Sequence, residues 1–252
     1  MDWTDSGIVL SARRHGDSSA ILTLLTLEHG RHAGLVRGGF SRTKRGILQA
    51  GNVMAASWRA RLEEHLGNYT IELESAHSPA FLDDPDRLSA LTSACAMAEA
   101  ALPEREPHEK IYLDFLYLLE ALPGPHWAAA YICWEIGLLA DLGFGLDLAT
   151  CAATGACDDL VYVSPKSGRA VSKEAGAPYR DKLLPLPQFL RVGEADSPQS
   201  QPPPSTEAVL EGLNLTGTFL ERHVFAPHHK GLPPARHRLV DRLTGITTIS
   251  GV

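Results

Sequence analysis

Cysteine and long hydrophobic runs are both scarce in this sequence. Four cysteines among 252 residues are too few for a disulfide scaffold, and their uneven spacing is typical of reduced thiols. The best membrane-span candidate, residues 128–140, contains Glu135 and falls short of the roughly 18 apolar residues that a bilayer-crossing helix needs. Residues 1–5 include two acids, where a secretory signal would need positive charge. We therefore expect a soluble, cytoplasmic protein with no membrane segment.

Motifs for catalysis are absent as well. The sequence has no P-loop, nucleophile elbow, zincin pair or dinucleotide fingerprint. The stretch from Ser41 to Lys44 has the S-x-x-K spelling of penicillin-binding enzymes, but it lacks the companion K-T-G and lies among basic loop residues. The acids at 83, 84 and 86 could form a Mg²⁺ cluster, but at a predicted helix start capping explains them better. We expect no enzymatic activity and no cofactor.

A zinc site is a second metal centre to consider from the sequence. Cys151 and Cys157 flank a glycine-containing loop, but five residues separate them, whereas a structural zinc site usually uses two C-x₂₋₄-C pairs. No second pair follows, although His223, His228 and His229 could complete a site from a distant helix. We therefore expect no bound metal. The alternative is zinc binding at Cys151 and Cys157.

Positive charge is distributed unevenly along the chain, whose net charge is −7. Residues 1–80 hold nine basic and eight acidic side chains, whereas residues 81–252 hold 14 basic and 22 acidic ones. Residues 29–62 contain seven basic groups and no acid. Arginine binds phosphate through two hydrogen bonds and stacks on exposed bases, so this pattern predicts an anion-binding surface. The alternative is a solvated basic face. The candidate nucleic-acid-binding residues are Arg13, Arg14, Arg31, Arg37, Arg42, Lys44, Arg45, Arg59 and Arg61.

The first 80 residues contain five short segments typical of β-strands. Each is rich in β-branched, leucine or aromatic residues, and glycine-, serine- or asparagine-containing turns separate them. Five short strands in such a length predict a small barrel, and the OB-fold is a five-stranded barrel of which one face commonly binds oligonucleotides. The predicted strands are residues 7–12, 20–27, 31–37, 52–58 and 69–74.

Residues 81–252 have mainly helical periodicity. Three consecutive helices, the first capped by Asp86, the second beginning near Pro107 and the third carrying Trp127, predict a bundle. Cys95 and Cys133 lie on helix faces, where we expect them in the core. The stripe formed by the aromatic residues of the third helix also favours core packing, with a groove for a partner's peptide as the alternative. The stripe comprises Trp127, Tyr131 and Trp134.

A ribbon interrupts this helical region. Residues 160–164 and 169–172, on either side of a Pro-Lys-Ser-Gly turn, predict a hairpin within an insertion of about 146–190. Residues 192–206 are polar and rich in proline, which predicts an extended, mobile linker. Further helices are predicted from Glu207 and over residues 235–243. The predicted fold class is α+β with two domains, an OB-fold barrel over 1–80 and a mainly helical domain over 81–252.

Three stretches of the chain together resemble one protein family. The first runs Gly7-Ile-Val-Leu, His15-Gly-Asp-Ser, Leu25-Thr-Leu-Glu-His-Gly30-Arg, Gly34-Leu-Val-Arg-Gly-Gly39 and Leu48-Gln-Ala-Gly51. The second is Glu135-Ile-Gly-Leu-Leu-Ala-Asp-Leu-Gly-Phe144, leading to Cys151 and Thr154-Gly155, and the third is Val163-Ser-Pro-Lys-Ser-Gly168-Arg. Their order over residues 1 to about 245 resembles that of the bacterial recombination mediator family RecO, particularly its alphaproteobacterial form.

The resemblance implies an N-terminal OB-fold, a helical C-terminal domain with an inserted ribbon, and a nucleoid-associated function. Proteins of this family bind single- and double-stranded DNA, anneal complementary strands, and help RecR and RecA displace single-strand-binding protein (SSB), whose acidic C-terminal tail they engage. Some members hold zinc with four cysteines in the ribbon, of which this sequence keeps Cys151 and Cys157. The leading hypothesis is therefore a non-enzymatic DNA-repair mediator. The alternatives are an adaptor whose basic barrel binds acidic peptides, and an enzyme whose site the motifs do not reveal.

Overall fold

The computed structural model describes residues 1–42, 44–191 and 202–245. They form two compact units, which we describe separately. The first unit comprises Met1–Pro123 with Pro233–Leu239, and the second comprises Gly124–Leu232 with the chain after Leu239. The barrel predicted for residues 1–80 thus shares its unit with the two helices that follow it.

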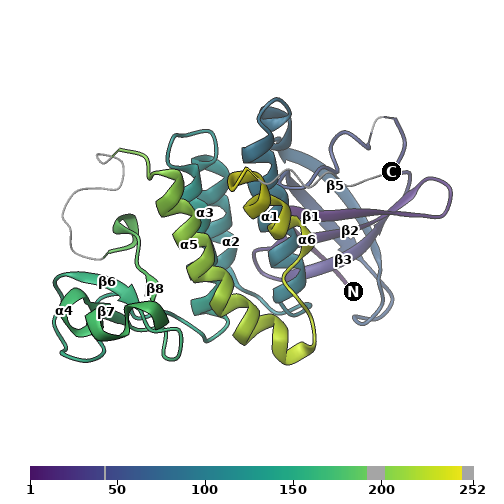
Figure 1. The fold of residues 1–252 in the computed structure, drawn as a ribbon. Helices are drawn as coiled ribbons and strands as arrows, with labels where there is room; N and C mark the ends of the chain where they lie inside the picture. Colours follow the sequence, from purple (N-terminus) through teal and green to yellow (C-terminus); the bar gives the residue numbers. More distant parts are fainter. Residues whose placement is uncertain (43, 192–201, 246–252) are drawn as a thin grey trace. The chain divides into compact units, whose positions relative to one another are not determined.

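Five strands at the start of the chain close into a barrel (Figure 1). The strands neighbour one another in the order β1-β2-β3-β5-β4, with β4 paired to β1. All pairs are antiparallel except β3 with β5, which are parallel. This topology confirms the predicted OB-fold. The strands are β1 (Asp2–His15), β2 (Ser19–Thr26), β3 (Gly30–Val36), β4 (Val53–Arg59) and β5 (Asn68–Ser75).

Alternating side chains fill the barrel. Along β3 every second residue is buried, which places His32, Gly34 and Val36 on the inner face. Gly34 is required there because a Cβ atom at this position would lie 2.4 Å from the ring of Tyr69 on β5. A bulge between Val9 and Ser11 bends β1, as barrel closure requires. The buried core comprises Val9, Ala20, Leu22, Leu24, Val36, Leu48, Met54, Ala56, Trp58 and Tyr69.

A helix covers one outer face of the barrel. Helix α1 (Pro85–Ala101) contacts β1 and β2, beside which Figure 1 places it. Thr23 and Leu25 alternate with the inward-pointing residues of β2, yet both are buried, so this outer face is covered as well. The N-cap of α1 is Asp84, whose Oδ1 accepts a hydrogen bond from the backbone N of Arg87 at 3.2 Å. The cap predicted at Asp86 is wrong by two residues, because Pro85 begins the helix and Asp86 lies in its first turn.

The first unit is completed by a short 3₁₀ helix, η1 (Ser78–Phe81), and by α2 (Glu109–Ala121). Tyr112 of α2 donates a hydrogen bond from Oη to Oγ of Ser6 on β1 at 3.1 Å. Cys95 of α1 is buried, as predicted. Both helices therefore belong to the packing of the barrel rather than to a separate bundle.

The second unit is built on two packed helices, α3 (Trp127–Asp141) and α5 (Thr206–Phe219). Buried Glu135 accepts hydrogen bonds from Tyr131 Oη at 2.8 Å and from Thr216 Oγ1, which joins the two helices. Tyr131 and Trp134 are also buried, which confirms core packing for these two residues of the aromatic stripe, whereas Trp127 is only partly buried. Cys133 is exposed, so its predicted place in the core is wrong: it faces away from the buried side of α3.

The ribbon lies between these helices in the sequence. It is a three-stranded sheet in the order β7-β6-β8, of which the third strand was not predicted. A π-helical turn, η4, follows α5 where continuous helix was expected. Residues 192–201 of the predicted linker lie outside the described residues. The remaining elements are β6 (Leu160–Val163), β7 (Ala170–Ser172), α4 (Lys173–Gly176), η2 (Ala177–Lys182), β8 (Leu184–Pro185), η3 (Gln188–Leu190), η4 (Leu220–Phe225), η5 (Ala226–His228) and α6 (Pro234–Leu243).

The structure also bears on membrane insertion. Of the helices in the described ranges, none has the length and apolar character needed to cross a bilayer.

Candidate nucleic-acid interface

Six of the nine candidate cations lie at one end of the barrel. This end is formed by the turn between β1 and β2 and by the long loop of residues 37–51 that joins β3 to β4. The register Ala20–Val36 places the start of β2 beside the end of β3, so both connections emerge together. We call this region the loop-end surface; its cations are Arg13, Arg14, Arg37, Arg42, Lys44 and Arg45.

Backbone hydrogen bonds hold the two connections against each other. Phe40 N donates to Ser18 O at 2.9 Å, which ties the loop to the β1–β2 turn. Within the loop, Arg45 N donates to Ser41 O at 3.0 Å and Lys44 Nζ donates to Arg37 O at 3.3 Å. These bonds fold the loop into a compact turn and fix the backbone positions from which its cationic side chains extend.

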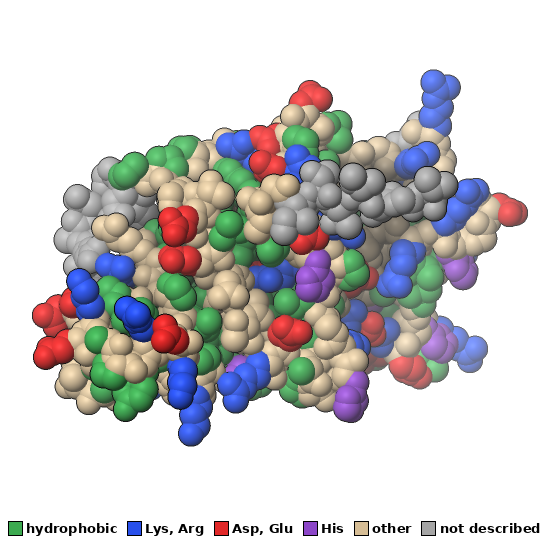
Figure 2. All heavy atoms as spheres, in the orientation of Figure 1, with side chains coloured by type: hydrophobic (Ala, Val, Ile, Leu, Met, Phe, Trp, Pro, Cys, Tyr) green, Lys and Arg blue, Asp and Glu red, His purple; other side chains and the backbone are tan. Residues whose placement is uncertain are grey.

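Five of these cations are exposed and have no carboxylate partner in the described part of the chain: Arg14, Arg37, Arg42, Lys44 and Arg45. Figure 2 shows several blue lysine and arginine side chains on the visible face of the barrel, at the right of the view. Unpaired arginine fits phosphate well, because its guanidinium donates two parallel hydrogen bonds without first breaking an ion pair.

Two other cations are partly neutralised by the segment that packs on the barrel. Arg13 lies 3.2 Å from Glu99 of α1, although its side chain is still 70% exposed. Arg31 lies 3.1 Å from Glu104, and its Nε donates to Leu102 O at 2.8 Å. The side chain of Arg31 is only 18% exposed, and its two contacts hold the chain after α1 against the barrel.

Arg59 and Arg61 lie toward the opposite end of the barrel. Arg59 ends β4 and pairs with Asp2 at the start of β1, far along that strand from Arg13. The amino group of Met1 donates to Ala60 O at 2.9 Å at the same end. The structure therefore brings together six of the predicted residues and places Arg31, Arg59 and Arg61 elsewhere.

The face that an OB-fold commonly uses for nucleic acid is obstructed in this chain. That face is formed by β2 and β3. Here α1 contacts β2, on which Thr23 and Leu25 are buried, and the backbone of residues 104–105 runs beside β3, where Arg105 N donates to Arg31 O at 2.9 Å. This face is therefore partly covered by the chain itself, whereas Arg37, Arg42, Lys44 and Arg45 of the loop-end surface are exposed.

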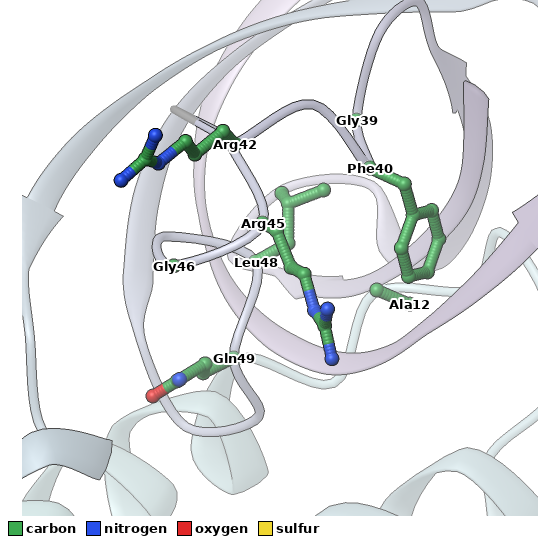
Figure 3. A pocket seen from close by; sticks show the side chains of 8 residues that line it. All are labelled: Ala12, Gly39, Phe40, Arg42, Arg45, Gly46, Leu48 and Gln49. Atoms are coloured by element: carbon green, nitrogen blue, oxygen red, sulfur yellow. The ribbon is translucent and has the colours of Figure 1, made fainter. Parts of the chain in front are cut away.

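A pocket of about 380 Å³ opens in the loop-end surface (Figure 3). Its apolar wall is formed by Ala12, Phe40 and Leu48, and its polar groups come from Arg42, Arg45 and Gln49. Figure 3 shows Phe40 and Arg45 extending side by side toward Ala12, whereas Arg42 extends in another direction. No acidic residue lines the pocket, as expected from the acid-free stretch of residues 29–62.

Sequence reasoning missed Phe40 and Gln49 as site residues. Phe40 lies in a Gly-Gly-Phe-Ser stretch that was interpreted only as turn chemistry, and Gln49 follows the basic run. The available signal was an aromatic residue inside an arginine-rich, acid-free segment, a combination typical of surfaces that bind single-stranded nucleic acid.

The two cysteines of the ribbon region differ in their environments. Cys151 is buried and its Sγ accepts a hydrogen bond from Ser172 N at 3.3 Å, whereas Cys157 is exposed. Burial raises the pKa of the Cys151 thiol, but hydrogen bonds from Ser172 and Thr154 outweigh it and lower that pKa to about 6. Across the described ranges, no three His, Cys, Asp or Glu residues are grouped closely enough to hold a metal ion.

An OB barrel with a basic loop end, joined to a helical unit with a ribbon, is the architecture that the sequence resemblance implied for recombination proteins. The family model described as Recombination protein O N terminal matches residues 1–76, and the one described as Recombination protein O C terminal matches residues 82–233. The chain belongs to the RecO family of DNA repair and recombination proteins.

Curated relatives match over nearly the whole chain. The DNA repair protein RecO of Rhodospirillum centenum is 54% identical, covering 100% of this chain and 98% of the relative. The protein of the same name from Rhodospirillum rubrum is 51% identical, covering 96% of each chain. The one from a Bradyrhizobium species is 49% identical, covering 97% of this chain and 96% of the relative. These matches place the chain in DNA repair and recombination.

Proposed function

We propose that this chain is a non-enzymatic recombination mediator that binds single- and double-stranded DNA through its loop-end surface and anneals complementary strands. The observation that supports this proposal is the gathering of six cations at one barrel end, five of them exposed and without a carboxylate partner among the described residues. Contacts to backbone phosphates give sequence-independent affinity, which a protein acting on any damaged region requires.

Annealing fits this surface because it needs no reacting group. Two strands repel each other through their phosphates, and cations that neutralise both backbones remove this barrier while the base edges stay free to pair. Basic groups at a barrel end, beside connections that project from it, can contact sugar–phosphate chains without enclosing them. We therefore expect the loop-end surface to accelerate strand pairing without catalytic residues.

The proposed partners follow from family membership and from charge. We expect the chain to work with RecR, to engage the acidic C-terminal tail of SSB, and so to help load RecA on SSB-coated single-stranded DNA. Residues 81–252 hold 22 acidic and 14 basic side chains, which disfavours DNA over this region and leaves it for protein partners.

Annealing of two complementary oligonucleotides, with and without an SSB coat, tests the proposal. The full chain is expected to accelerate pairing in both conditions. A variant with Arg42→Ala, Lys44→Ala and Arg45→Ala should lose most of this acceleration, because it removes three exposed cations of the loop-end surface.

The matched control removes the same charge from the second unit through Lys166→Ala, Lys173→Ala and Lys182→Ala, all at exposed positions. This control should anneal as fast as the unaltered chain. Failure of the unaltered chain in both conditions would contradict the mediator proposal. Capture of an acidic peptide without any oligonucleotide binding at low salt would favour the adaptor instead.

A further inference from the structure

We infer that the pocket of the loop-end surface takes one unstacked nucleotide of single-stranded DNA, with its base against Phe40 and its phosphates at Arg42 and Arg45. The inference rests on the proposed DNA binding and adds a base-accepting site to a surface otherwise argued only from charge. The volume of about 380 Å³ lies at the lower end of the range of ligand sites, which suits one small planar group.

The apolar wall is suited to an aromatic ring. Phe40 is only partly buried although it packs against the barrel core, so part of its ring is available to a ligand. Leu48 beside it is buried and belongs to the core, which makes this side of the pocket rigid. Gly39 lets the loop approach the barrel closely, because a Cβ atom there would lie 2.6 Å from Ala20 Cβ. The loop therefore presents Phe40 on a fixed base.

The cations lie where the backbone of such a strand would pass. Figure 3 shows Arg45 extending beside Phe40 and Arg42 extending away from both. A base inserted against Phe40 leaves its flanking phosphates at the pocket mouth, within the region of these guanidinium groups. The guanidinium plane of Arg45 can also stack on a base, which every nucleobase permits.

Gln49 lines the pocket but does not present its amide oxygen to a ligand. Its Oε1 is buried, and Figure 3 shows its side chain extending away from Phe40 and Arg45. The pocket therefore recognises the face of a base through Phe40 and its phosphates through the arginines, without selecting a base by its edge.

The combination of an aromatic ring with two arginines allows the pocket to distinguish a nucleotide from a bare anion. An anion alone would use Arg42 and Arg45 but leave Phe40 without a role in binding. A paired base in a duplex could not enter, because both its face and its edge are occupied. The pocket therefore gives the loop-end surface a preference for unpaired strands, which a protein that acts before pairing requires.

The experiment compares two single-stranded oligonucleotides of equal length and charge, one with mixed bases and one with abasic sugars throughout. The unaltered chain should bind the oligonucleotide with bases more tightly. Phe40→Ala should weaken that binding about 5- to 100-fold, the range for losing one base–aromatic stack, and change abasic binding less than about 2-fold. Phe40→Leu, which keeps apolar bulk against the core, should lose base-dependent affinity, and Phe40→Tyr should retain it.

The matched control is Tyr117→Ala, which removes an exposed aromatic ring from α2 in the same compact unit and should alter neither affinity. Thermal unfolding of each variant verifies folding. Equal losses on both oligonucleotides, or no loss on either, overturn the nucleotide site while DNA binding stands. If Phe40→Ala abolishes binding of an acidic, aromatic-containing peptide but leaves the base-dependent DNA affinity intact, the nucleotide site is overturned in favour of a peptide site. If the unaltered chain binds neither oligonucleotide at low salt, the proposed function fails instead.

Discussion

A histidine inside the barrel shows how a single residue can couple this fold to pH. His32 is 3% exposed, and its Nδ1 lies 2.9 Å from Tyr69 Oη on β5. Burial, with the nearby charges of Arg105 and His29, lowers the pKa of His32 from 6.5 to about 4. The folded barrel therefore keeps this imidazole neutral under conditions in which the unfolded chain would already bind a proton.

The first prediction concerns the free energy of unfolding as pH falls. The pKa of His32 is lower in the folded chain than in the unfolded one. The free energy of unfolding therefore has its full value above pH 6.5 and decreases as pH falls toward 4. Between pH 7.5 and 4.5 the unaltered chain should lose about 2–3 kcal/mol more than a His32→Gln variant, in urea unfolding at both values. Equal losses in the two proteins would show that His32 is not the responsible group.

The strands illustrate what the sequence predicts at the scale of elements. Segments rich in β-branched, leucine or aromatic residues located all five strands, and glycine- or asparagine-containing turns located most of their ends to within a few residues. The first five residues of β1 were missed because Asp2, Thr4, Asp5 and Ser6 have no hydrophobic period. Burial of the outer face of β2 by α1 was not predictable, because local patterns do not reveal which distant helix packs on a strand.

The candidate site was likewise predictable from the sequence only in part. The absence of acids over residues 29–62 located the loop that carries Arg42, Lys44 and Arg45. The sequence did not separate these cations from Arg31, because the partner of Arg31 is Glu104, 73 residues further along the chain. Sequence patterns therefore predict where charge accumulates, whereas tertiary contacts decide which charges are free to bind.

The second prediction tests barrel closure between β3 and β5. Gly34→Ala places a methyl group 2.4 Å from the ring of Tyr69 inside the barrel, so the ring or the strand must shift. We expect a loss of about 1–3 kcal/mol in the free energy of unfolding, as is typical of overpacked cores.

Gly46→Ala is the control, because a Cβ atom at position 46 has nothing within 4 Å. It should change the free energy of unfolding by less than about 0.5 kcal/mol in the same urea titration. Comparable losses in both variants would show that the clash with Tyr69 does not govern closure.

The whole molecule combines a barrel region of nearly balanced charge with an acidic remainder. Because residues 1–80 hold nine basic and eight acidic groups, attraction for DNA depends on how the cations are placed rather than on their excess. The fold places six of them at one barrel end, while α1 and the chain after it occupy the face of β2 and β3. Which cations of the barrel region remain exposed is thus decided jointly by the barrel and by the segment that packs on it.

The salt dependence of single-stranded DNA binding tests this central claim most directly. Each phosphate contact contributes about 0.7 to the slope of log affinity against log salt concentration. Arg42→Ala, Lys44→Ala and Arg45→Ala together should lower the magnitude of that slope by up to about 2, whereas the matched triple variant at Lys166, Lys173 and Lys182 should leave it unchanged. An unchanged slope in the first variant, or equal reductions in both, would contradict the assignment of DNA binding to the loop-end surface.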